Sequence, residues 1–186
     1  MHTPLKILGI PGSLRLSSYN YAALVAAQKL VPDGVVLDII DLDGIDLFNQ
    51  DTEHQPNDKL IEFKQRIRDA DAILFSTPEY NYSIPGVLKN AIDAASRPYG
   101  DSAWTGKPVA VMGASIGAFG TARAQYHLRQ CFITLKMFAL TQPEVMIPHA
   151  DKVFDADGNL TDQNSQKLIR QLLESLAALT LQLDKK

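Results

Sequence analysis

Residues 5–30 read LKILGIPGSLRLSSYNYAALVAAQKL, in which a short apolar run, a Gly/Ser-rich turn and a helix-like pattern follow one another. This order is typical of phosphate-binding sites, because the first N–H groups of a helix lack internal partners and carry partial positive charge. The turn also offers side-chain hydrogen-bond donors: Ser13, Arg15, Ser17, Ser18 and Asn20. We therefore expect a phosphorylated cofactor, held here without a metal.

A purely structural interpretation of the turn stays open at this point, since Ser and Asn are ordinary N-cap residues and Gly-Ser pairs are common in loops. The turn is not a Walker A loop, because no GKS or GKT follows at the required spacing. Gly9 and Gly12 also do not form the G-x-G-x-x-G dinucleotide fingerprint. The rest of the chain must decide between the two interpretations.

Length and composition favour one ordinary globular domain over residues 1–186. The chain has 186 residues, 46% of them hydrophobic and 21% charged, which is enough for one sizeable core. The net charge is −3 and no basic block is present, so nucleic-acid binding is not expected.

Cysteine usage and hydropathy favour a cytoplasmic location. The single cysteine, Cys131, cannot form an internal disulfide, and its apolar helical surroundings favour a buried structural thiol over a nucleophile. The N-terminus lacks the apolar core of a signal peptide, and no apolar run approaches the ~20 residues that span a bilayer. We expect neither secretion nor membrane insertion.

The apolar pattern alternates between short strand-like runs and longer helical runs. The expected strands are 6–10, 35–40, 72–76, 109–113 and a weaker one at 144–147, and the expected helices are 19–30, 58–69, 85–96, 118–135 and 162–183. Strands rich in Val, Ile and Leu without alternation are typical of a parallel sheet covered on both faces. Five such βα units predict an α/β fold with right-handed crossovers.

Three polar loops are expected at one edge of this sheet, since ligands of open parallel sheets bind beyond the carboxyl ends of the strands. They are GSLRLSSYN (12–20), TPEYNYSIPGVLKN (77–90) and GASIGAFG (113–120). The middle loop is the most specific, because its prolines stiffen it while tyrosines provide flat surfaces for a planar heterocycle. The same tyrosines would also suit a subunit interface. Glu79 has no apparent titratable partner and is interpreted as a loop-positioning or interface charge.

On these three segments the chain resembles the NADPH-dependent FMN reductase family, within the flavodoxin-like group that includes bacterial quinone, chromate and azo-dye reductases. The segments that carry the resemblance are GSLRLSSYN, PEYNYSIPGVLKNAIDAASRP and GASIGAFGTARAQYHLRQ, and LFNQD at 47–51 is also similar to the family. It spans most of residues 5–145, and its second segment is the most specific.

The resemblance implies a doubly wound, five-stranded flavodoxin-like sheet in the order 2-1-3-4-5, with helices on both faces and non-covalent FMN. It assigns the phosphate to four residues of the first loop: Ser13, Arg15, Ser18 and Asn20. It assigns the isoalloxazine to the middle loop and to two residues of the third: Pro78, Glu79, Tyr80, Asn81, Tyr82, Ser83, Ile84, Ser115 and Gly117. It also implies a homodimer or homotetramer, with Arg123, Tyr126 and Glu144 as interface residues, although a solvated helix face remains the alternative for this trio.

The chemistry implied by the resemblance is a ping-pong cycle, in which NADPH delivers hydride to N5 of FMN and a quinone, azo compound, chromate or free flavin is then reduced. No catalytic side chain is expected, because the flavin carries the reaction. No metal site is expected either, since the four histidines are scattered. Asp155, Asp157 and Asn159 resemble part of a calcium loop, but the required Gly and Glu are misplaced, which favours a polar turn that caps the last helix.

Two other functions stay open from the sequence. A flavodoxin-like electron carrier would share the fold, although carriers tend to be more acidic than a net charge of −3. A nucleotide-binding Rossmann protein would use Asp41 for a ribose, but this residue lies farther from the glycine turn than the usual ~20 residues.

Overall fold

The computed structural model describes residues 3–184, which form one parallel sheet with helices on both faces. Its strands are β1 (Leu5–Pro11), β2 (Val35–Ile39), β3 (Ala72–Ser76), β4 (Pro108–Ala114), β5 (Phe138–Ala139) and β6 (Val145–Ile147). Its helices are α1 (Tyr19–Gln28), α2 (Asp58–Asp69), α3 (Gly86–Ala95), α4 (Ala122–Thr134), α5 (Ala150–Val153) and α6 (Gln163–Leu183), with a 3₁₀ turn η1 (Gln50–Thr52).

The strand order is β2-β1-β3-β4-β5, which confirms the predicted 2-1-3-4-5 topology. The strand expected at 144–147 is confirmed as β6, but the position beside β4 is divided, because a second short strand, β5, was not expected there. β5 pairs with the start of β4 and β6 with its end, both in parallel. The segment between them contains Pro143, which has no N–H to donate to a ladder.

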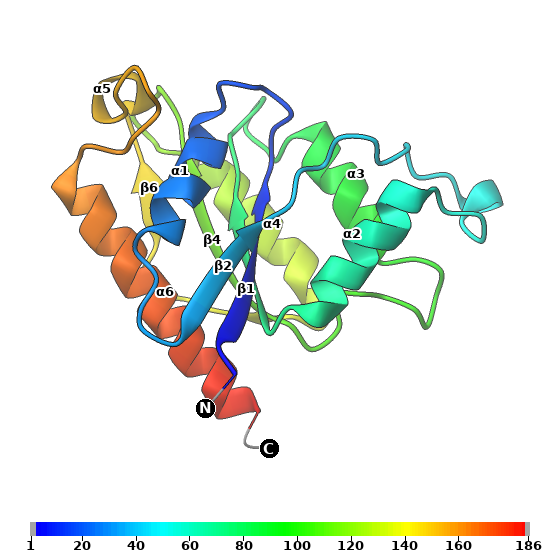
Figure 1. Cartoon of the computed structure of the whole chain (residues 1–186). Helices are drawn as coiled ribbons and strands as arrows, with labels where there is room; N and C mark the ends of the chain where they lie inside the picture. The colour runs from blue at the N-terminus through cyan, green and yellow to red at the C-terminus, as the bar shows by residue number, and fades with distance from the viewer. Residues whose placement is uncertain (1–2, 185–186) are drawn as a thin grey trace.

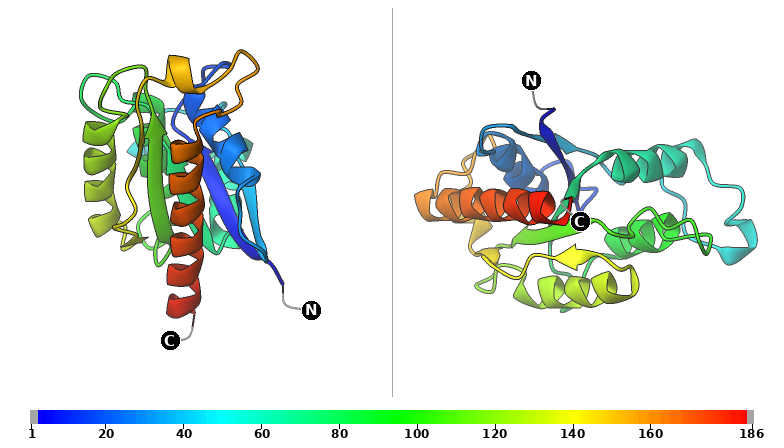
Figure 2. Two further views of the ribbon diagram at one scale, coloured as in Figure 1. Left: turned by 90° about the vertical axis from the view of Figure 1, so that its left-hand side faces the viewer. Right: turned by 90° about the horizontal axis from the view of Figure 1, so that it is seen from below.

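Two hydrophobic layers enclose the sheet. One layer joins α1 and α6 to one face through residues such as Leu24, Leu172 and Leu176. The other joins α2, α3 and α4 to the opposite face through residues such as Phe63 and Phe132. Figure 1 shows α1 and α6 on one side of the strands and α2 and α3 on the other, and Figure 2 shows α6 running along the sheet.

Three helix starts differ from the sequence prediction: α6 begins at Gln163 instead of residue 162, and the other two, of α3 and α4, lie at the candidate site. Pro85 is the N-cap of α3, so the helix itself begins at Gly86. α4 begins at Ala122 instead of residue 118, because residues 115–121 form a loop that ends with Thr121 in the left-handed conformation (φ 71°). The connection between β4 and α4 is therefore longer than residues 114–117, which separate the expected strand from the expected helix.

The carboxyl ends of β1, β3 and β4 lie side by side, since β3 pairs with both of the other strands in parallel. The loops that follow these strands therefore leave the sheet at one edge, at the upper end of the molecule in Figure 1. This arrangement is the one expected from the sequence for the three polar loops.

The segment before α6 is a polar turn that leads into a helix cap, as predicted. The Oδ1 atom of Asp155 accepts hydrogen bonds from the backbone N–H groups of Asp157 and Asn159. Asp162 is the N-cap of α6, and its carboxylate accepts the N–H of Ser165 at 2.7 Å. No helix within residues 3–184 combines the length and the apolar character needed to cross a membrane.

Candidate functional site

The first loop joins β1 to α1 as an exposed turn. Ser18 is the N-cap of α1, where its hydroxyl oxygen accepts the N–H of Tyr21 at 3.3 Å. The hydroxyl oxygen of Ser13 accepts the N–H of Arg15 at 3.2 Å. Both serines therefore shape the turn, and each keeps an O–H hydrogen that can be donated to a ligand.

Unused donors gather on this turn. Within residues 3–184, the backbone N–H groups of Leu14, Leu16 and Ser17 have no protein acceptor. In the same part of the chain the exposed guanidinium of Arg15 forms no ion pair. Backbone N–H groups beside a helix N-terminus and a nearby cation are suited to a phosphate.

Asn20 lies at the same turn, but its side chain points into the protein. It is 3% exposed, and its amide forms hydrogen bonds with the backbone of Ala114 and the hydroxyl of Ser76. Direct contact between this side chain and a phosphate stays a prediction. The observed role is a link between the turn and the ends of β3 and β4.

The middle loop contains a tight two-residue hairpin. Tyr80 and Ser83 exchange both backbone hydrogen bonds at 3.0 Å, and Asn81 and Tyr82 between them have φ values of 51° and 66°. Positive φ at both central positions is the pattern of a type I′ turn, and it is uncommon for a bulky residue such as Tyr82. Such backbone conformations concentrate at ligand sites, where the surrounding structure must stabilise them.

Glu79 provides part of that stabilisation. α4 has no side-chain cap of its own, and the carboxylate of Glu79 instead accepts the N–H groups of Arg123 and Ala124 at 3.1 and 3.3 Å. The same carboxylate also pairs with the Arg123 guanidinium. A negative charge at a helix N-terminus is favourable. The loop-positioning interpretation of Glu79 agrees with this geometry, while contact with the isoalloxazine remains a prediction for it.

Two residues of α4 contact side chains of the hairpin, and the sequence analysis predicted neither contact. The Arg123 guanidinium lies 3.8 Å from the ring centroid of Tyr82. The Nδ1 atom of His127 lies 3.0 Å from the hydroxyl of Ser83. His127 lies on an exposed face of α4. Only the spacing of these residues along one face of a correctly bounded helix could have indicated these contacts.

The third loop follows β4 and is anchored to the segment after β6. The backbone N–H of Ser115 donates to Ile147, and the Ser115 hydroxyl accepts the N–H of Gly117 at 3.1 Å. Close packing explains the nearby Gly113, because a Cβ there would lie 1.9 Å from the Thr121 hydroxyl and 2.4 Å from the Thr77 carbonyl oxygen. The start of the second loop and the end of the third loop thus both pack against Gly113.

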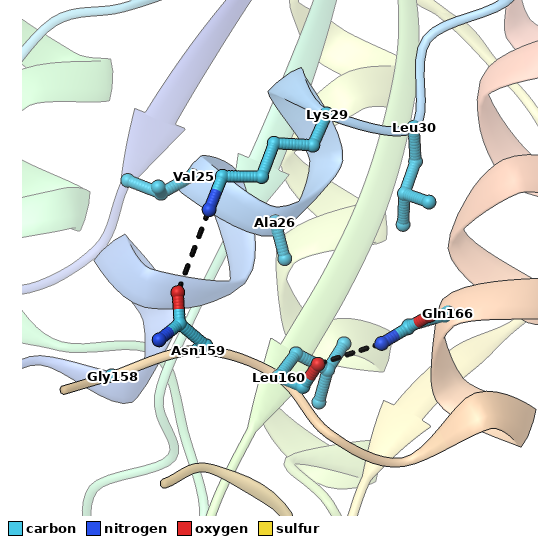
Figure 3. A pocket seen from close by; sticks show the side chains of 8 residues that line it. All are labelled: Val25, Ala26, Lys29, Leu30, Gly158, Asn159, Leu160 and Gln166. Carbon is cyan, nitrogen blue, oxygen red and sulfur yellow. Dashed lines mark hydrogen bonds between the residues drawn. The ribbon is translucent and has the colours of Figure 1, made fainter. Parts of the chain in front are cut away.

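Hollows border the turn, whereas a separate small pocket lies farther along α1. A hollow of about 400 Å³ lies beside Ser13, Arg15 and Tyr21. The separate pocket, of about 180 Å³, lies between the second half of α1 and residues 158–166 (Figure 3). It contains no aromatic side chain, and its one cation, Lys29, is directed toward Asn159. The pocket beside the second half of α1 therefore offers little to hold a flavin ring.

The predicted interface residues do not form one cluster within the described chain. Arg123 pairs with Glu79, Tyr126 is exposed, and Glu144 is half-buried.

Cys131 is half-buried on α4 instead of buried, and burial raises the pKa of its thiol, which disfavours the reactive thiolate.

Comparisons with known proteins agree with this site. The family model described as NADPH-dependent FMN reductase matches residues 5–152. The chain belongs to this family. It is 52% identical to an NAD(P)H-dependent FMN reductase of Pseudomonas aeruginosa and 44% identical to a 2-hydroxy-1,4-benzoquinone reductase of Burkholderia sp.. These alignments cover 95% and 94% of this chain, and 95% of each relative.

A solved structure supports the same assignment to the FMN reductase family. The flavoenzyme NAD(P)H:(acceptor) oxidoreductase of Paracoccus denitrificans superposes with a TM-score of 0.87 at 32% identity, covering 96% of this chain and 98% of its own. The protein is accordingly an NAD(P)H-dependent oxidoreductase that uses FMN. An FMN-bound azoreductase of Bacillus anthracis, at 15% identity and a TM-score of 0.59, shares the fold.

Proposed function

We propose that this FMN reductase uses NAD(P)H to reduce quinones, with its flavin held by the three loops at the carboxyl ends of β1, β3 and β4. The observation that carries the proposal is that two loops meet at one edge of the sheet. The first loop has backbone N–H groups without acceptors in the described chain, and the second loop contains a rigid hairpin with aromatic side chains. Its relatives named for quinone reduction support the choice of acceptor, since two of them are 44% identical to this chain.

The donor set of the first loop fits the phosphate of FMN. The free N–H groups of Leu14, Leu16 and Ser17 would donate to phosphate oxygens, together with the hydroxyls of Ser13 and Ser18. Arg15 would neutralise the phosphate charge without giving up an existing ion pair in the described chain.

The second and third loops fit the flavin ring. We assign Pro78–Ile84 to one side of the ring, where the hairpin backbone can bond to its polar edge, and Ser115 and Gly117 to the other side. Tyr80, Tyr82 and Phe119 are exposed and supply apolar surface for planar substrates. FMN, when bound, supplies the hydride and electron-transfer chemistry, so no side-chain nucleophile is required.

A flavodoxin-like electron carrier is the alternative function, and it is not favoured. The relatives at 44–52% identity are named as reductases that use NAD(P)H or reduce quinones. An archaeal flavodoxin shares the fold at only 15% identity, which says nothing of function.

The test is an anaerobic double-mixing experiment on the FMN-loaded protein. We expect NADPH to bleach the flavin absorbance band, and one equivalent of benzoquinone to restore it in a single phase. Bleaching that benzoquinone does not reverse would refute the quinone as acceptor. A protein that keeps its FMN but is not bleached by NADPH or NADH would instead be the electron carrier.

We further propose that the chain acts as a homodimer or homotetramer in the cytoplasm. The exposed side chains of Tyr82, Phe119, Tyr126 and Ile133 form apolar surface on and beside α4, and Arg123 lies next to it. Burial of this surface between subunits would stabilise an oligomer. Sedimentation equilibrium measures the oligomer directly, and a monomer at micromolar concentration would refute it.

A further inference from the structure

We propose that Asn20 is a positioning residue that aligns the phosphate-binding turn with the two ring-binding loops. The proposal rests on the FMN site assigned above. The side chain of Asn20 has its hydrogen-bond partners inside the protein. We therefore assign it a role there, in place of a direct contact with the phosphate.

The amide of Asn20 binds the last residue of β4 at two points. Its Nδ2 atom donates to the Ala114 carbonyl at 2.9 Å, and its Oδ1 atom accepts the Ala114 N–H at the same distance. Oδ1 also accepts the hydroxyl of Ser76, the last residue of β3, at 3.1 Å. Asn20 itself belongs to the first turn of α1, directly after the phosphate-binding turn.

Ala114 needs such a partner because its neighbouring strand has ended. The pairing of β3 with β4 stops at Ser76 and Met112, and the chain after Thr77 turns away into the second loop. The backbone N–H and C=O of Ala114 would otherwise be buried without partners, which is unfavourable. The amide of Asn20 thus takes the place of one more residue of β3.

This link fixes three loops relative to one another. The first loop leads into α1, whose second residue is Asn20, the second loop begins after Ser76 and the third begins after Ala114. FMN has a fixed covalent length between its phosphate and its ring, so a shift between the loops would misalign one end of the ligand whenever the other end is bound. Preorganisation of this kind lowers the cost of binding and keeps the reacting ring in place.

Three variants test the proposal. Asn20→Ala removes the whole link, and Arg15→Ala removes a proposed direct phosphate contact without touching the link. Gln125→Ala is the matched control, because Gln125 is a similarly buried amide that bonds to the backbone of Val145 and to the hydroxyl of Thr121, and not to the phosphate-binding turn. For each variant we would measure FMN affinity, the visible circular dichroism of the bound flavin and the rate of flavin reduction by NADPH at saturating FMN.

We expect Asn20→Ala to raise the FMN dissociation constant about 10- to 100-fold. Because the ring loops also lose their anchor, the circular dichroism of the bound flavin should change and the reduction rate should fall about tenfold. Arg15→Ala should also weaken FMN binding, because it removes a proposed phosphate contact, but it leaves the hydrogen bonds of Asn20 intact. Gln125→Ala should destabilise the fold but leave FMN affinity within about twofold.

The proposal is overturned if FMN-saturated Asn20→Ala has the dichroism and rate of the wild type, or if Gln125→Ala weakens FMN binding as much as Asn20→Ala. Should Asn20→Ala fail to fold, Ser76→Ala decides, since it removes only the hydroxyl that donates to Oδ1 of Asn20. We expect an intermediate change in dichroism for this variant, and an unchanged signal would refute alignment. Wild-type protein that binds no FMN would instead refute the underlying site.

Discussion

Replacement of Glu79 by alanine removes the cap that the second loop provides for α4. Two backbone N–H groups, of Arg123 and Ala124, then lose their acceptor, and the loss of an N-cap interaction costs about 1 kcal/mol. The ion pair with Arg123 adds less than about 1 kcal/mol, because the arginine side chain is 36% exposed and can be hydrated. We therefore expect the free energy of unfolding to fall by about 2 kcal/mol.

Urea denaturation followed by circular dichroism measures this change, and Arg123→Ala separates its parts. Arg123→Ala removes the ion pair and the contact with Tyr82 but keeps both backbone bonds to Glu79. The Glu79 variant should therefore be the less stable of the two. Glu62→Ala, at an exposed site on α2, should change stability by less than about 0.5 kcal/mol. A loss below 0.5 kcal/mol for Glu79→Ala would refute the capping argument.

Three further variants test separate parts of the structure. Arg15→Ala should raise the FMN dissociation constant about 10- to 100-fold in a titration of apo-protein, and unchanged affinity would remove Arg15 from the phosphate site. Gly113→Ala should lower stability by about 3 kcal/mol in urea, since its Cβ would collide with Thr121 and Thr77, and wild-type stability would contradict the close packing described. Asp162→Ala should cost about 1 kcal/mol at pH 7. Hydrogen bonds from Ser165 lower the pKa of Asp162, so its stabilisation is present above about pH 4 and is lost as pH falls through the folded-state pKa. Urea curves for this variant and the wild type should therefore converge near pH 2, and a constant difference would contradict the linkage.

The parallel sheet and the edge that carries the site were predictable because they depend on patterns that the sequence displays directly, whereas the strand order came from the resemblance to the FMN reductase family. Continuous apolar runs identify parallel strands, and polar segments after the first, third and fourth strands identify the loops. The division of the fifth strand was less visible, because β5 has only two residues and its pattern is too short to stand out from a loop.

Side-chain direction was the main limit of the sequence prediction. The phosphate assignment of Asn20 stays a prediction, but nothing in the sequence indicated that its amide also bonds to Ala114, which is 94 residues away along the chain. The contacts of Glu79 with α4 depend in the same way on the packing of two distant segments. Such long-range pairs leave no periodic signal in a single sequence.

The most direct test of the FMN site is an equilibrium titration of the apo-protein with FMN and, separately, with riboflavin. We predict one FMN per chain, bound at least about 100-fold more tightly than riboflavin, because only FMN carries the phosphate that the donor turn would hold. Equal affinities for the two flavins would contradict a phosphate site at residues 13–18, and no binding of either would contradict the flavin site as a whole.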